Sequence, residues 1–246
     1  SIGGESHVLF ETIKDLHPVS KNYDSNVLSA KDCTPEISRE LQTRFFQHAV
    51  KPDGSKPKPG EPMRLLEKTP KNALRIPFMM QLFPDALFVY LYRNPKQVIS
   101  SMMDAWQSGR FITYPDLPGW TGTPWSLLLT PGWRDCIGLP LHHVVAHQWA
   151  AATKIMLDDL EALDPSRVIK IRYETLIEKP QDELNRICTD CGISAIENLS
   201  TMPLSQFTLT PPDPNKWLRN EQLINEIWPI IEAQALRAER YMADTP

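Results

Sequence analysis

The chain has 246 residues, of which 41% are hydrophobic, so it can bury one sizeable hydrophobic core. Its formal net charge of -4 excludes the broad cationic field that drives binding to nucleic acids or anionic membranes. We therefore expect no nucleic acid and no membrane partner, and any anion site must be local. No apolar run approaches the length of a membrane span, and residues 1–4 lack the basic and apolar parts of a secretion signal.

The four cysteines are too few and too scattered for a disulfide framework, which favours a reducing compartment, the cytoplasm. Cys188 and Cys191 match C-x-x-C, but they lie at a predicted helix end before Gly192 and have no second Cys/His pair nearby. We interpret them as small apolar fillers on a helix. We expect no metal.

The first predicted helix starts at Thr34, which can cap it, with Pro35 at the first helical position. Apolar residues at helical spacing then line one face. Residues 51–62 are rich in Pro, Gly and Lys and predict an exposed loop. Residues 63–66 could form a short buried strand.

Residues 86–92 form a continuous apolar run, the pattern of a strand covered on both faces. A helix is predicted directly after it, because Asn94 can cap it, Pro95 suits its first position and Gly109 can end it.

Residues 109–140 show no clear periodicity, and a structureless stretch of this length is usually a lid or a binding loop. A long helix over residues 141–163, a strand over 167–172 and further helices follow, and Pro229 should kink or restart the last one. Strands that alternate with helices predict an α/β fold with a parallel sheet flanked by helices on both faces. We expect residues 1–246 to form a single domain.

Arg93 is placed where ligands collect in such sheets, at the carboxyl end of a strand and before a helix N-terminus. Its planar guanidinium can hold a phosphate through two hydrogen bonds, and Ser101, about two helical turns on, offers a hydroxyl toward the same side. By itself, Arg93 could equally be a capping residue paired with a surface carboxylate.

An ordered series of short motifs favours the phosphate-binding interpretation of Arg93 over the capping one. It comprises residues 67–72, 75–78, 83–86, 93–95, 101–106, 168–176 and 215–217. This series resembles the sulfotransferase superfamily from Glu5 to the end of the chain. The resemblance implies a P-loop-kinase-like sulfotransferase fold and the transfer of a sulfonate group from 3′-phosphoadenosine 5′-phosphosulfate (PAPS), which leaves 3′-phosphoadenosine 5′-phosphate (PAP).

The same resemblance assigns the donor site. Arg93 and Ser101, spaced eight apart, would hold the 3′-phosphate, and Tyr173 would lie near the adenine. Lys216 and Trp217 resemble the late loop that closes over the nucleotide. Family members also begin with a strand and a Ser/Thr-rich loop that grips the 5′-phosphosulfate, and we expect that strand, loop and the following helix to be absent from the 246 residues.

The sequence offers more than one assignment of the catalytic groups. Lys68 matches the lysine beside the transferring group, where it would offset negative charge, unless it is an ordinary solvated lysine. Some members carry a histidine where this chain has Pro70, so the general base must lie elsewhere. Glu5 matches the glutamate that related sulfotransferases use as the base, and the alternative is a carboxylate paired with an arginine.

His147 is the main rival of Glu5 as the base, because with His143 it lies on the helix face away from the apolar stripe. Ordinary surface histidines would fit that face as well. The spacing of four would also suit two metal ligands, but the glutamate of H-E-x-x-H is missing. His7 is a third candidate, and Arg110, which opens the long loop, could meet an acidic acceptor.

Residues 109–134 resemble the sulfotransferase domains embedded in polyketide synthases, such as those of curacin and olefin synthases. The resemblance implies a 3-hydroxyacyl chain on an acyl carrier protein as the acceptor, in polyketide or alkene biosynthesis. We expect Arg110 or Arg134 to help dock the carrier. The aromatic residues Phe111, Tyr114, Trp120, Trp125 and Trp133 would cover the acyl chain. Two alternatives stay open: a free-standing sulfotransferase for small-molecule, lipid or carbohydrate hydroxyls, and a donor-binding pseudoenzyme.

Overall fold

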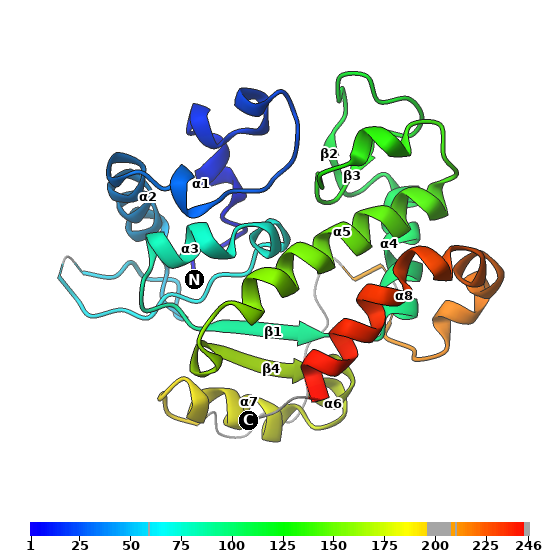
Figure 1. Ribbon diagram of the computed structural model, residues 1–246. Coiled ribbons are helices and arrows are strands. Elements are labelled where there is room, and N and C mark those ends of the chain that lie inside the picture. Colours follow the sequence, from blue (N-terminus) through cyan, green and yellow to red (C-terminus); the bar gives the residue numbers. More distant parts are fainter. Residues whose placement is uncertain (59, 196–207, 210, 244–246) are drawn as a thin grey trace. The chain divides into compact units, whose positions relative to one another are not determined.

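The computed structural model describes residues 1–58, 60–195, 208–209 and 211–243. Two compact units are present, Ser1–Ala86 with Leu128–Gly132, and Leu87–Leu127 with Trp133–Pro246. Figure 1 follows the chain through both units. The expectation of a single domain stays a prediction.

The first unit is helical in its described part. Its α-helices are α1 (His7–Glu11), α2 (Pro35–His48) and α3 (Ile76–Leu82), and its short 3₁₀ helices are η1 (Lys14–Leu16), η2 (Pro18–Lys21), η3 (Ala30–Asp32) and η4 (Pro70–Leu74). Helix α2 starts as predicted, because the Thr34 hydroxyl accepts a hydrogen bond from the backbone N–H of Ile37. The ring of Phe10 packs against those of Phe45 and Phe78 in the core.

The strand predicted at residues 63–66 is wrong. This segment has no strand pairing, and the side chain of Leu66 is 74% exposed. A strand needs a neighbouring backbone to complete its hydrogen bonds, and the apolar residues here gain no burial from one.

The second unit contains two parallel strands, β1 (Phe88–Tyr92) and β4 (Val168–Arg172), whose arrowheads point the same way in Figure 1. Helix α8 (Glu221–Ala243) covers one face, where the rings of Tyr90 and Tyr241 lie 5.6 Å apart. On the other face Ile169 and Ile171 pack against α6 (Tyr173–Glu178) and α7 (Pro180–Asp190). Helices on both faces of a parallel sheet confirm the α/β fold class.

One part of the strand prediction is wrong. Val89 and Leu91 on β1 are 46% and 49% exposed, so β1 is not covered on both faces by the described residues. The reason is geometric: α7 packs on β4, the neighbouring strand, through Leu184 and Ile187.

Helix α4 (Pro95–Ser108) confirms its predicted bounds. The Asn94 side chain accepts a hydrogen bond from the backbone N–H of Lys96, and Pro95 opens the helix. Gly109 ends it with φ of +65°, a left-handed conformation that costs glycine little.

The segment between α4 and the long helix α5 (Leu141–Glu161) is more ordered than predicted. It contains the antiparallel strands β2 (Ile112–Tyr114) and β3 (Trp125–Ser126) and the 3₁₀ helix η5 (Trp133–Cys136). The rings of Trp106, Trp120, Trp125 and Trp133 contact one another in a cluster. Gln148 ties this cluster to α5, because its side chain accepts from the Trp106 indole N–H and donates to the Ser126 carbonyl.

This packing corrects the expected use of the aromatic side chains. Tyr114, Trp125 and Trp133 are buried within the loop, so they cannot lie against an acyl chain. Phe111 and Trp120 are only partly buried and stay available for contacts. Three of the five aromatic residues predicted to cover the acyl chain therefore stabilise the loop itself.

The C-terminal helix α8 runs through Pro229 without a break, so the predicted restart is wrong. The 3₁₀ helix η6 (Pro165–Arg167) precedes β4, and η7 (Lys216–Asn220) leads directly into α8.

Candidate functional site

The parallel register fixes the centre of the site. Tyr92 at the end of β1 pairs with Arg172 at the end of β4, so the next residues, Arg93 and Tyr173, emerge side by side. The Arg93 guanidinium lies 4.6 Å from the centroid of the Tyr173 ring, within cation–π range. Its Nε donates to Gln97 Oε1 over 3.1 Å, which holds the side chain along α4.

Arg172 is held away from this centre. Its Nη2 lies 2.7 Å from Glu239 Oε1 on α8, and this hydrogen bond raises the pKa of Arg172. Burial, together with Glu239, raises the pKa of the neighbouring Tyr92, which stays a neutral phenol. Of the two strand-end arginines, Arg93 is therefore the one directed to the site.

A pocket of about 240 Å³ opens at this edge of the strands. It is lined by the four predicted residues Arg93, Ser101, Tyr173 and Lys216 and also by Asp104, Ala105, Phe111, Thr208, Leu209, Pro211 and Pro212. Two cations and three hydroxyl-bearing residues against a single carboxylate make this pocket suited to an anion. Ser101 reaches it from α4 as its spacing from Arg93 predicted.

The 3₁₀ helix η7 is fastened to α4 by polar contacts. The Asp104 carboxylate forms ion pairs with Arg219 and with Lys216, whose Nζ lies 3.5 Å from Oδ2. Asn220 Nδ2 donates to Ser100 Oγ over 3.0 Å. These contacts fix the segment that carries Lys216 into the pocket.

Trp217 lies outside the pocket that its neighbour Lys216 lines. The Lys96 ammonium lies 4.5 Å from its ring centroid, at the first turn of α4, and Trp217 does not line the pocket. Sequence reasoning missed Asp104. Its position three residues after Ser101, which places both on one helix face, is the signal that could have found it.

A second group of predicted residues comes together in the first unit. Lys68 Nζ donates to Glu5 Oε1 over 2.7 Å, and His7 Nδ1 lies 3.4 Å from Glu5 Oε2. The Glu5 carboxylate thus has a lysine on one oxygen and a histidine near the other. The expected alternative, a carboxylate paired with an arginine, is replaced by a pair with Lys68, whose side chain is 74% exposed.

Glu67, which sequence reasoning quoted without a role, holds this group together. Its carboxylate accepts hydrogen bonds from the backbone N–H of Ser6, the hydroxyl of Thr69 and the amide of Asn72. The Ser6 N–H also donates to Thr69 Oγ1 over 2.7 Å. Two segments more than 60 positions apart are thereby joined, which sets Glu5 and His7 beside Lys68.

A buried ion pair between Lys71 and Glu11 stabilises the same region of the first unit. Lys71 donates to Glu11 on α1, and burial lowers the pKa of Lys71 while Glu11 opposes that shift. Because a buried charge without its partner is costly, this pair fixes α1 against η4.

His147 and Arg110, also predicted as site residues, lie in the second unit. His147 is exposed on α5, and Arg110 is exposed directly after α4. Neither lines the pocket. His143, expected beside His147, instead contacts Glu226 on α8.

Comparison with known proteins was made on sequence and on structure. The sequence model described as "Sulfotransferase family" matches residues 13–197, which include Arg93, Ser101 and Tyr173 but not Glu5 or Lys216. Among the described residues, no helix is both long and apolar enough to cross a membrane.

Two curated relatives are similar over part of the chain. The nodulation protein NoeE of Sinorhizobium fredii is 24% identical over 159 residues, 58% of this chain and 33% of its own length. The omega-hydroxy-beta-dihydromenaquinone-9 sulfotransferase Stf3 of Mycobacterium tuberculosis is 24% identical over 130 residues, 53% of this chain and 29% of its own. The chain therefore spans about a third of the length of these relatives.

Among solved structures, the sulfotransferase domain from the curacin biosynthetic pathway matches with a TM-score of 0.45 and 20% identity. The match covers 86% of this chain and 68% of that one.

The contacts of Asp104 generate a prediction about η7. We expect Asp104→Asn to speed amide hydrogen exchange in residues 216–220 by about tenfold, because each partly exposed ion pair contributes up to about 1 kcal/mol and two are lost. Hydrogen exchange followed by mass spectrometry measures this. Asp116→Asn, in the exposed loop after α4, is the control and should leave this segment unchanged. Equal protection in both variants would mean that Lys96 and Ser100 suffice to hold η7.

Proposed function

Because the chain belongs to the sulfotransferase family, we propose that it transfers a sulfonate group from PAPS to a hydroxyl group and releases PAP. One observation supports this above the others: Arg93, Ser101, Tyr173 and Lys216 line a single pocket at the carboxyl ends of two parallel strands. Ligands of open α/β sheets bind at this edge.

The donor's 3′-phosphate suits the Arg93 side of the pocket. A guanidinium forms two parallel hydrogen bonds to phosphate oxygens, and the Ser101 hydroxyl adds a third donor. The Tyr173 ring, held at 4.6 Å by the same guanidinium, offers a flat face for adenine. Lys216 adds positive charge to the pocket, and the contact of Trp217 with Lys96 helps to hold the segment that carries Lys216.

We expect Arg93→Ala and Ser101→Ala to weaken PAP binding, the first by about tenfold to a hundredfold, because a hydrogen bond to a charged group contributes about 1.5–3 kcal/mol. Both variants should also lose the preference for PAP over adenosine 5′-phosphate, which has no 3′-phosphate. Isothermal titration calorimetry with both nucleotides measures this.

Arg39→Ala is the matched control, since Arg39 is an exposed arginine on α2 with a side chain that is 76% exposed. It should bind both nucleotides like the parent. If Arg93→Ala and Ser101→Ala keep PAP affinity within twofold, the assignment of the 3′-phosphate site is wrong.

We propose Glu5 as the general base, with Lys68 at the transferring sulfonate. The acceptor hydroxyl loses its proton to a Glu5 oxygen as the new S–O bond forms and the bond from sulfur to the phosphate oxygen breaks. The Lys68 ammonium offsets charge on the sulfonate and on the departing phosphate oxygen. The Lys68 side chain is 74% exposed, so its ammonium is open to an anionic ligand. His147 is the rival base and His7 the third candidate.

Glu5→Gln should lower single-turnover sulfonate transfer by about 10²–10⁴ while PAP affinity stays within twofold, since a base acts in the transition state. His147→Ala distinguishes the rival, and a loss there with normal Glu5→Gln rates would reassign the base. Rapid-quench measurements on the full-length protein give the rates. Parent rates in both variants would make His7→Gln the next test.

For the acceptor we propose a 3-hydroxyacyl chain on an acyl carrier protein. The support is the resemblance of residues 109–134 to synthase-embedded domains, and the exposure of Arg110 and Arg134, which could meet an acidic carrier or acceptor. Phe111 lines the donor pocket and is the aromatic side chain best placed to contact an acyl chain. The four cysteines are too few and too scattered for a disulfide framework, which supports a cytoplasmic location.

Mass spectrometry of a 3-hydroxyacyl carrier protein incubated with PAPS and the full-length protein should show one added sulfonate. Carrier protein with an unhydroxylated acyl chain is the control and should stay unmodified. Transfer only to free sugars, phenols or lipids would favour the free-standing enzyme. Donor binding without transfer to any hydroxyl would favour a pseudoenzyme.

A further inference from the structure

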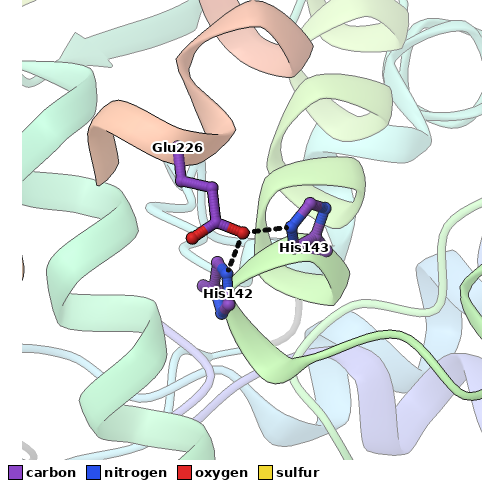
Figure 2. A group of neighbouring side chains, drawn as sticks. All are labelled: His142, His143 and Glu226. Carbon is purple, nitrogen blue, oxygen red and sulfur yellow. Dashed lines mark hydrogen bonds and ion pairs between the residues drawn. The ribbon is translucent and has the colours of Figure 1, made fainter. Parts of the chain in front are cut away.

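Three side chains outside the donor pocket converge at the start of α5. His142 Nε2 and His143 Nε2 lie 3.1 and 3.0 Å from the same oxygen, Oε1 of Glu226 on α8. Figure 2 shows both rings directed at this carboxylate. The two imidazole centroids are 4.6 Å apart.

This convergence is unusual for adjacent helical residues. Successive side chains point about 100° apart around an α-helix, so neighbours in sequence rarely share a partner. Here the carboxylate of a second helix fills the space between them. The ligand atoms of all three residues lie within 4.8 Å of one another.

These distances suit a metal ion. Zinc binds imidazole nitrogen and carboxylate oxygen at about 2.0–2.2 Å, which separates the ligands of a tetrahedral site by about 3.3–3.5 Å. The observed separations of 3.0 and 3.1 Å from nitrogen to oxygen need little adjustment to reach that range.

The ligand chemistry points the same way. Imidazole and carboxylate together favour zinc, nickel or copper, whereas calcium and magnesium prefer oxygen ligands. With side-chain exposures of 13%, 27% and 54% for His142, His143 and Glu226, solvent can supply a further ligand.

We propose that His142, His143 and Glu226 bind a divalent transition-metal ion of the zinc class, which links α5 to α8. The ion replaces two N–H···O hydrogen bonds with two nitrogen–metal bonds, and each ring then carries its proton on Nδ1. Glu226 lies on the second turn of α8, and α8 follows directly after η7, which carries Lys216. The ion therefore stabilises the start of α8. The site departs from the expectation that no metal binds, and it does not depend on the proposed donor or acceptor.

The test is a calorimetric titration of the metal-free full-length protein with Zn²⁺ alone. We expect one saturable site, and binding at least about tenfold weaker in His143→Gln and in Glu226→Gln, equivalent to about 1.4 kcal/mol. Two controls should bind as the parent does: His48→Gln removes an unrelated exposed histidine, and Cys191→Ser removes the more accessible cysteine of the C-x-x-C pair.

Co²⁺ absorption gives a second readout that does not rely on the affinity of a variant. Visible absorption bands typical of Co²⁺ with four or five ligands indicate a bound ion. The absence of thiolate-to-metal charge-transfer bands then indicates nitrogen and oxygen ligands. The parent should show these bands, and circular dichroism without metal should show that each variant is folded. Absence of saturable binding in the parent, loss only in Cys191→Ser, or equal affinity in folded Glu226→Gln would overturn the proposal and leave the three residues as a hydrogen-bonded contact between helices.

Discussion

The in-register parallel pairing of β1 with β4 is the constraint on which the proposed donor site depends. Because Tyr92 and Arg172 end their strands opposite each other, the next residues leave the sheet at the same point. A shift of one position would turn Arg93 or Tyr173 to the other face. The pairing itself is stabilised by burial on both sides of β4, with α8 on one face and α7 on the other.

Ion pairs then determine which charged side chains face the pocket at that edge of the sheet. Arg172 is drawn to Glu239 on α8, which leaves Arg93 as the strand-end cation of the pocket. Asp104 forms ion pairs with Lys216 and Arg219, and the charged side chains that line the pocket keep an excess of positive charge on an acidic chain. A local anion site of this kind needs no basic surface, which agrees with a net charge of -4.

The two groups of candidate site residues are built by different means. In the proposed donor pocket, Arg93 and Tyr173 follow strand ends and Ser101 lies on α4, so regular elements position these three residues. Glu5, His7 and Lys68 lie on irregular backbone or short helices, and the hydrogen bonds accepted by Glu67 keep them together. Loops carry catalytic groups in many enzymes because a rigid scaffold positions them.

The sequence by itself determined the elements around Arg93 and Ser101, since a capped helix after an apolar strand is a local pattern of hydrogen bonding and burial. It also suggested which residues share the pocket. Only the tertiary structure decided that Trp125 and Trp133 are core residues, because burial depends on packing between segments distant in sequence. The same holds for the ion pairs of Asp104 with Lys216 and Arg219 and for the convergence of two helices at Glu226, since a partner across space leaves no periodic signal along the chain.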